Sequence, residues 1–194
     1  IQAKAVPPGL VSRYVYAMHR LFVAIRPPRA IRERLIGLMG GVSGARWLSD
    51  DQIHLTLRFI GEVDRHLASD VHAALGSIHH PAFEIALDGM HVFDRRGEPV
   101  TLWVGATPQE SLRALHKKVD QACLLAGIAP DRRTFLPHIT IARLGRGSGP
   151  ITSALENSGG VTSDRFTVGD FCLYESDLTP DGPIYTLVER YSLD

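Results

Sequence analysis

Apolar residues along the chain follow two periods, one typical of strands and one typical of helices. Runs rich in β-branched and aromatic residues predict strands over 20–25, 53–60, 83–93, 101–106 and 135–144, and near 164–175 and 184–191. Apolar residues spaced by three or four positions predict helices over 31–38 and 64–78, from a capping box at 107–110 to Gly127, and more weakly near 151–157. The order is βαβαββ followed by αβαββ. Because strands and helices mix without strict alternation, this order favours an α+β fold with largely antiparallel sheets.

Two of the predicted strands carry the same four-residue pattern. His54 and Thr56 alternate with two leucines in HLTL, and His138 and Thr140 alternate with two isoleucines in HITI. Because strand side chains alternate between faces, each His–Thr pair shares one face while the aliphatic residues point to the core. The copies occupy comparable places in the two halves of the chain. They indicate an internal two-fold arrangement, with two imidazoles and two hydroxyls around one cleft.

These side chains suit acid–base hydrolysis of a phosphodiester. An imidazole has an unperturbed pKa of about 6.5, so one histidine can take a proton from water while the other gives one to the leaving oxygen. The hydroxyls of Thr56 and Thr140 can donate hydrogen bonds to non-bridging phosphate oxygens. Each proton-transfer role contributes about 10²–10⁴ in rate, so we expect catalysis without a metal ion or cofactor. A single copy would be explained better as the polar face of a sheet, whereas two copies favour the functional interpretation.

Two further residues lie near these motifs. Arg58 is four residues after His54, on the same face by simple alternation. It is therefore a candidate to attract a phosphate, with a solvated arginine at the rim as the equal alternative. Phe22 is a candidate for the cleft floor or for base stacking, against the commoner interpretation of core packing. The other histidines form no metal-binding motif, and no GxxxxGK[ST] phosphate-binding loop is present.

Bulk properties narrow the class of protein. The 194 residues, 44% hydrophobic and 22% charged, fit one globular domain starting near Met18, with 1–17 expected to be an upstream extension or an appended, non-native segment. No apolar run is long enough to predict a membrane span. A net charge of zero argues against coating of long nucleic acid but permits binding of one RNA end or a small phosphate ligand. Cys123 and Cys172 are expected to be free buried thiols, which favours the cytoplasm, and we expect a monomer.

The paired motifs resemble those of the 2H phosphoesterase superfamily, in particular of the LigT/ThpR-type RNA 2′,3′-cyclic phosphodiesterases, also called 2′-5′ RNA ligases. The similarity rests on HLTLRFIGEV and PHITIARL, with RLFVAIRPP and FCLYESDLTPDGPIYTLVERYSL flanking them, and covers the chain from Met18 onward. It implies a single bilobal domain over 18–194, with two pseudo-symmetric lobes, each a mainly antiparallel sheet with outer helices, flanking a central groove. It also implies that His54 is the proton donor and His138 the proton acceptor.

The same resemblance gives Arg143, five residues after His138, a contact with the phosphate. With simple alternation this odd offset would point the Arg143 side chain away from His138, so a contact with the phosphate requires a twist or bulge near the strand end. The implied reaction is metal-independent hydrolysis of RNA 2′,3′-cyclic phosphate ends to 2′-phosphates, together with reversible 2′-5′ ligation, for example of tRNA halves. Two alternatives stay open: a phosphodiesterase acting on a small cyclic nucleotide or ADP-ribose cyclic phosphate, and a non-catalytic module that binds RNA ends.

Overall fold

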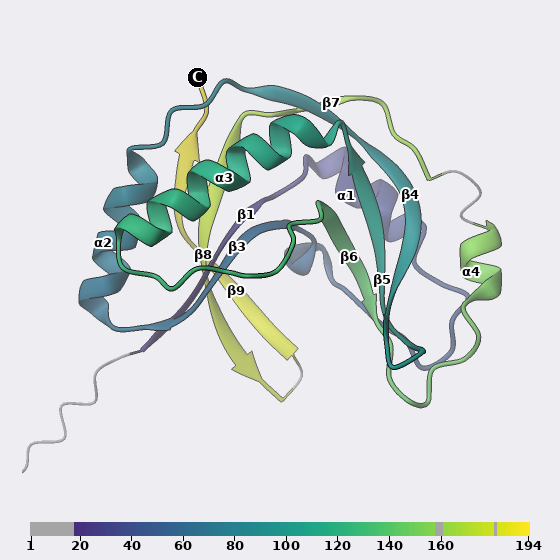
Figure 1. Ribbon diagram of the computed structural model, residues 1–194. Helices are drawn as coiled ribbons and strands as arrows, with labels where there is room; N and C mark the ends of the chain where they lie inside the picture. The colour runs from purple at the N-terminus through teal and green to yellow at the C-terminus, as the bar shows by residue number, and fades with distance from the viewer. Residues whose placement is uncertain (1–17, 158–160, 181) are drawn as a thin grey trace, which may run out of the picture.

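The computed structural model describes residues 18–157, 161–180 and 182–194, so the prediction for 1–17 lies outside the described residues. The elements of the first half are β1 (His19–Ile25), α1 (Arg29–Gly37), β2 (Arg46–Trp47), the 3-10 turn η1 (Asp50–Gln52), β3 (Leu55–Val63), α2 (Arg65–Gly76), β4 (Phe83–Arg95) and β5 (Glu98–Thr107). Those of the second half are α3 (Gln109–Leu125), β6 (His138–Arg143), α4 (Thr152–Asn157), β7 (Phe166–Val168), β8 (Asp170–Thr179) and β9 (Gly182–Ser192). The α+β prediction is confirmed (Figure 1).

The strands of both halves belong to one hydrogen-bonded sheet rather than to two separate sheets. Its order is β7-β4-β5-β6-β3-β1-β8-β9, with β2 added beside β6, and every strand pairing among the described residues is antiparallel. Two parts of this sheet, β7-β4-β5-β6 and β3-β1-β8-β9, meet between β3 and β6 through the single registered pair Leu55↔Ile139. These two residues stand between the histidine and the threonine of each motif. The join of the sheet is therefore also the place where the two motifs face each other.

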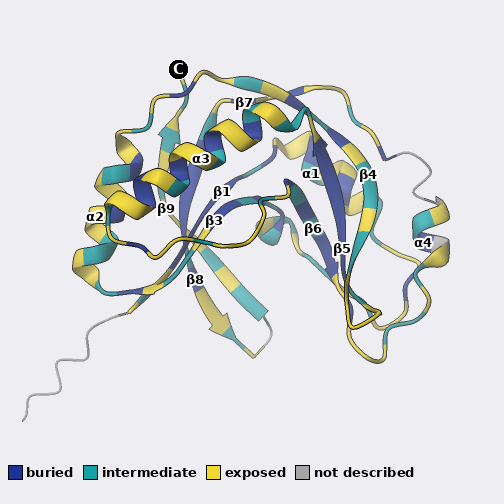
Figure 2. Cartoon of the chain, in the orientation of Figure 1, coloured by how far each residue is buried: buried dark blue, intermediate teal, exposed yellow. Residues whose placement is uncertain are grey.

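Helices α2 and α3 pack together and cover the half of the sheet that contains β3 (Figure 1). In α3 the apolar positions Leu112, Leu115 and Val119 are fully buried, as their helical spacing predicts, and the outer face is exposed (Figure 2). Burial of each such side chain stabilises the fold by about 1.5–3 kcal/mol. No helix in the described part of the chain is long and apolar enough to cross a membrane.

Both motif strands contain a β-bulge immediately after the threonine. In β3, Thr56 pairs with Ala24 and Arg58 pairs with Val23, which leaves Leu57 as the extra residue. The pairing of β6 with β5 skips Ile141 in the same way. A bulge inserts one residue and reverses which face the following side chains occupy. In both strands, strict alternation therefore fails from the fourth residue after the histidine onward.

Several predicted boundaries differ from the structure because tertiary pairing decides them. Strand β3 continues through Gly61, whose positive φ of 88° accommodates a second bulge against β1, instead of ending there. The predicted capping box is wrong: Thr107 pairs with Ala86 in the sheet, Pro108 occupies the N-cap, and no side-chain cap is formed. Gly127 follows α3 with φ of 98°, as its predicted role in ending the helix requires.

Candidate active site

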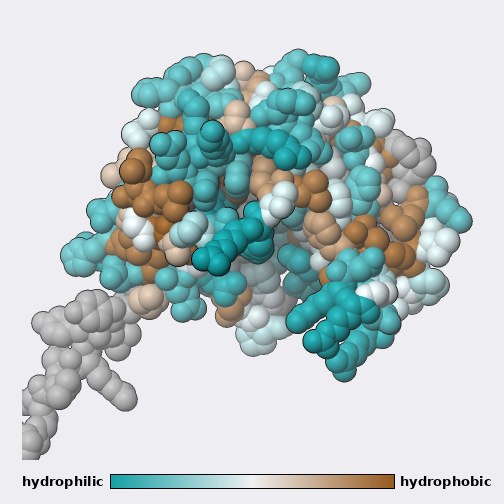
Figure 3. All heavy atoms as spheres, viewed as in Figure 1, coloured by the Kyte–Doolittle hydropathy of each residue, from teal (hydrophilic) through white to brown (hydrophobic). Residues whose placement is uncertain are grey.

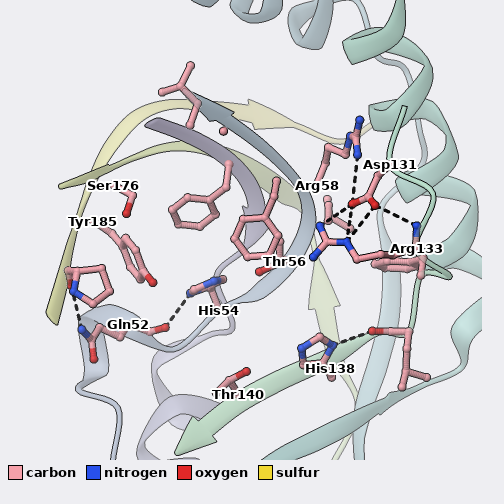
Figure 4. Close-up of a pocket in the computed structure, with 18 of the residues that line it drawn as sticks. Gln52, His54, Thr56, Arg58, Asp131, Arg133, His138, Thr140, Ser176 and Tyr185 are labelled. Atoms are coloured by element: carbon pink, nitrogen blue, oxygen red, sulfur yellow. Dashed lines mark hydrogen bonds and ion pairs between the residues drawn. The ribbon is translucent and has the colours of Figure 1, made fainter. Parts of the chain in front are cut away.

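The two motifs line one cleft of about 980 Å³ at the join of the sheet. His54 and Thr56 reach it from the start of β3, and His138 and Thr140 reach it from β6 (Figure 4). In the space-filling view the face is hollowed near its centre, with hydrophilic residues over most of it and apolar patches to either side (Figure 3). The antiparallel register around Leu55↔Ile139 sets His54 opposite Thr140 and Thr56 opposite His138. The structure thus brings together the four residues that the sequence pattern paired.

Each motif histidine is fixed by a hydrogen bond to the backbone carbonyl two residues before it. His54 Nδ1 lies 2.7 Å from the Gln52 carbonyl oxygen, and His138 Nδ1 lies 2.8 Å from the Leu136 carbonyl oxygen (Figure 4). A carbonyl only accepts, so Nδ1 carries the proton and donates it in both rings. In the neutral imidazole this leaves Nε2 unprotonated. Both rings therefore offer the same nitrogen for proton transfer.

Aromatic side chains hold the two imidazoles in place. The ring of His54 lies 5.0 Å from Phe22 and 5.3 Å from Tyr185, measured between centroids. The ring of His138 lies 5.0 Å from Phe93 and 5.7 Å from Trp103. Contacts of this kind are worth about 0.5–1.5 kcal/mol for aromatic pairs and restrict the ring orientation.

The predicted alternatives for Phe22 are resolved by its surroundings. It is 3% exposed, lines the cleft, and also packs on Phe59 and Tyr174. It belongs to a buried core cluster with Cys172 and Tyr174, so the core-packing interpretation is confirmed, and its ring also forms part of the cleft wall beside His54. Sequence reasoning did not find Tyr185 or Phe93, because neither lies next to a motif and only the folded sheet brings them to the histidines.

The environment lowers the pKa of both histidines in the free protein. Burial lowers the pKa of His54 to about 4, since desolvation disfavours the imidazolium, and the charge of Arg143 acts in the same direction. Burial also lowers the pKa of His138, again with help from Arg143. Both imidazoles are therefore neutral near pH 7 before a ligand binds, and either can accept a proton.

Arg143 lines the cleft, and the bulge that its predicted role required is present. Ile141 and Ala142 are both buried in succession, after which Arg143 returns to the side of His138 and is exposed. Its Nη1 donates a hydrogen bond of 3.1 Å to Thr101 Oγ1, and no carboxylate pairs with it among the described residues. Its guanidinium is therefore available to an anion beside both histidines.

Arg58 requires a correction, because the matching bulge at Leu57 moves it off the face of His54. It is 4% exposed, so the solvated rim position is wrong. Its guanidinium lies 3.1 Å from Asp120 and 3.2 Å from Asp131, and it also donates to the Ala129 carbonyl. Because its guanidinium is paired with these two carboxylates and this carbonyl, Arg58 does not offer a free cation to a phosphate, although part of it lines the cleft. Through these contacts Arg58 connects β3 with α3 and with the segment that precedes β6.

The cleft is positively charged although the whole chain is neutral. Among the described residues that line it are six arginines and one carboxylate, Asp131. Arg46 and Arg143 are neighbours on β2 and β6, where they pair in register. Sequence reasoning missed Arg46, since β2 is a two-residue strand with no periodicity to predict it. No group of three or more His, Cys, Asp or Glu that could hold a metal ion occurs among the described residues.

We expect the titration of His54 to respond to a bound phosphate. In the free protein its pKa is about 4, and a nearby anion raises it because the imidazolium is then favoured. Protonated His54 binds the anion better, so affinity for a 2′-phosphate ligand should increase as the pH falls from the bound-state pKa toward 4. NMR titration of the imidazole Cε1 proton measures both values.

The His54→Gln variant is the control for this titration, because it removes the group while the phosphate ligand keeps its own titration. The pH dependence of binding should be weaker in that variant. A free-state pKa of about 6.5 for His54, or a value that the ligand leaves unchanged, would contradict the expectation.

The fold around this cleft matches that of a solved phosphoesterase. The chain is similar to E. coli LigT in apo form, with 27% identity, 91% of this chain and 98% of that chain covered, and a TM-score of 0.74. The model of the 2′-5′ RNA ligase superfamily matches residues 27–180, and the chain belongs to that superfamily. Curated relatives named RNA 2′,3′-cyclic phosphodiesterase include one from Aeropyrum pernix, 35% identical over 73% of this chain and 83% of its own length. Another, from Archaeoglobus fulgidus, is 30% identical over 86% of this chain and 96% of its own length.

Proposed function

We propose that the protein hydrolyses RNA 2′,3′-cyclic phosphodiester ends to 2′-phosphates. The observation that carries the proposal is the pair of imidazoles, each with Nδ1 bound to a carbonyl and Nε2 available to one cleft. Curated relatives named for this activity support the choice of substrate. The alternative of a non-catalytic RNA-end module is disfavoured, because such a module would need neither matched tautomer.

In the proposed reaction His138 acts as the base and His54 as the acid. Nε2 of His138 removes a proton from water as the water oxygen forms a bond to phosphorus. The bond from phosphorus to the 3′-oxygen breaks, and His54 Nε2–H donates its proton to that oxygen. The products are a 3′-hydroxyl and a 2′-phosphate, and the proton taken up by one histidine balances the proton lost by the other. No metal ion is needed for either transfer.

The lowered pKa of His54 is reconciled with an acid role by the charge of the substrate. The free protein holds His54 neutral at pH 7, whereas a phosphodiester anion beside the ring favours the imidazolium. Thr56, Thr140 and Arg143 line the same cleft and would donate hydrogen bonds to the non-bridging oxygens, where negative charge develops. In 2′-5′ ligation the same groups would keep the same roles, with a 5′-hydroxyl in place of water as the nucleophile.

An end-group assay tests this function directly. A short RNA with a 2′,3′-cyclic phosphate should be converted to a 2′-phosphate end, with equal rates in EDTA and in buffer without it. The pH profile of kcat/KM should be bell-shaped, since one group must be deprotonated and the other protonated. A 3′-phosphate product would show that the other P–O bond breaks, and loss of activity in EDTA would contradict the metal-free mechanism. Parallel rates on a small cyclic nucleotide and on ADP-ribose cyclic phosphate compare the alternative substrates.

A further inference from the structure

The segment that joins α3 to β6, residues 126–137, contains no helix or strand, yet it carries the carbonyl that binds the proposed base. The N–H of Ile128 still bonds to the end of α3, but for 129–137 no backbone–backbone hydrogen bond occurs among the described residues. Irregular backbone of this kind is held in place by packing and by side-chain contacts. The residues of this segment that line the cleft are Asp131, Arg133, Thr134, Phe135 and Leu136.

Arg58 reaches this segment from β3, four residues after His54, and its side chain is 3% exposed. Its Nη2 donates to the Ala129 carbonyl, and its Nη1 lies 3.2 Å from Asp131 Oδ2 (Figure 4). Its Nε lies 3.1 Å from Oδ1 of Asp120 in α3, and neither of these two buried atoms has a hydrogen-bond partner elsewhere in the described part of the chain. One guanidinium therefore joins β3, α3 and the segment.

Asp131 extends this restraint along the segment. Its Oδ1 accepts the backbone N–H of Arg133 at 3.0 Å, which closes a tight turn. The hydrogen bonds from Arg133, with the charge of Arg58 in support, hold the pKa of Asp131 well below its usual range, so the carboxylate stays charged. Two residues further on, Phe135 stacks on His116 of α3 with 4.0 Å between ring centroids. The segment is therefore fixed on both sides of Arg133, shortly before the carbonyl that binds the base.

The carbonyls that bind the two motif histidines are held differently. Gln52, whose carbonyl binds His54, lies in η1, where its N–H donates to the Ser49 carbonyl at 2.9 Å and its side chain completes a capping box. Leu136, whose carbonyl binds His138, has no such backbone hydrogen bonds among the described residues and depends on the rest of its segment. Loss of the contacts made by the buried guanidinium should therefore affect the base and not the acid.

We propose that Arg58 is a positioning residue for the base. By holding the 126–137 segment, it places the Leu136 carbonyl so that His138 keeps its proton on Nδ1 and presents Nε2 to the cleft. The inference rests on the proposed function, because it takes His138 to be the base. It adds a buried side chain of the first motif strand to the residues that prepare the second motif for proton transfer. In this role Arg58 contacts neither the substrate nor the reacting atoms.

The test removes the guanidinium without leaving a buried charge unpaired. Loss of one partner of a buried ion pair is strongly destabilising, so Arg58→Met is combined with Asp120→Asn. In this double variant Asp131 keeps its hydrogen bonds from Arg133. Val71→Ala, at a fully buried residue of α2 outside the cleft lining, is the control for a loss of stability alone, and Tm is measured for both proteins.

The first measurement is the tautomer of each imidazole, read from the NMR shifts of the ring nitrogens near pH 7, where both rings are neutral. In the double variant His138 should become a mixture of the two tautomers, while His54 keeps its proton on Nδ1 because η1 is intact. Arg58→Lys keeps a cation between the two carboxylates but has no fork of donors, so it should recover part of the wild-type tautomer. An unchanged tautomer at His138, an equal change at His54, or the same change in Val71→Ala overturns the proposal.

The second measurement is hydrolysis of the cyclic-phosphate RNA. The double variant should lose about 10²-fold in kcat, the cost of misplacing a catalytic group by about 1 Å. KM should change little, because Thr56, Thr140 and Arg143 still bind the phosphate. A rise in KM with unchanged kcat would show that Arg58 binds the substrate, and would overturn the proposal. A mixed tautomer with wild-type kcat would contradict the base role of His138 while confirming the positioning by Arg58, so the two proposals can fail separately.

Discussion

Replacement of His138 by alanine is expected to lower kcat/KM on a cyclic-phosphate RNA by about 10²–10⁴. The base is then absent, and proton transfer by a positioned side chain contributes this much. His54→Ala should cause a loss of similar size. The measurement is hydrolysis by purified protein at saturating and subsaturating substrate, with far-UV circular dichroism to establish that the fold is retained. His66→Ala, at an exposed histidine of α2, is the matched control and should retain full activity.

A substrate with a good leaving group separates the two roles. A phosphodiester that releases p-nitrophenolate needs little protonation of the departing oxygen, so it should reduce the defect of a variant that lacks the acid. We expect partial recovery in His54→Ala and none in His138→Ala. Recovery in the His138 variant instead would reverse the assignment, and wild-type rates in both variants would contradict acid–base catalysis by this pair.

The second large effect is expected for Arg143→Ala, with a loss of about 10²–10³ in kcat. Arg143 lies beside both histidines without a carboxylate partner among the described residues, so its charge is available to the developing phosphorane oxygens. The loss should fall on kcat more than on KM, because the oxygens gain charge in the transition state. Arg34→Ala, at an exposed arginine of α1 outside the cleft lining, is the control.

The pH profile gives a second measurement on the same variant. The charge of Arg143 lowers the pKa of both histidines, so its removal should raise both values and move both limbs of the kcat/KM profile to higher pH. A variant that loses activity with an unchanged pH profile would indicate that Arg143 acts away from the histidines. Full activity would remove it from the site.

The sequence alone predicted the chemistry because the key signal is local. A strand exposes every second residue, so the HLTL and HITI segments indicate a shared face for each His–Thr pair before any fold is known. The duplication then indicates that the two faces meet. Helix α3 was predictable on the same grounds, since its buried positions repeat at helical spacing.

After each motif threonine, strand periodicity no longer predicts which face of the sheet a side chain occupies. Simple alternation placed Arg58 on the face of His54 and Arg143 away from His138, and the structure reverses both positions. One bulge in each strand, at Leu57 and at Ile141, causes both reversals. A bulge depends on how a strand pairs with its neighbour. The neighbours here are β1 for β3 and β5 for β6, and each lies far in sequence from the strand with which it pairs. Only the assembled sheet contains that information.

The sequence by itself determined the α+β class, the two His–Thr pairs and their suitability for proton transfer, because each depends on residue type and on the period of a single element. The tertiary structure decided which nitrogen of each imidazole is available, how far burial lowers each pKa, and which residue five positions after each histidine reaches the cleft. These depend on carbonyl positions, on neighbouring rings and on strand register, all of which involve residues far apart in the chain. Phe59 and Arg143, the fifth residues after the two histidines, both line the cleft because of the bulges, so a symmetric pair of motifs forms a cleft with two different ends.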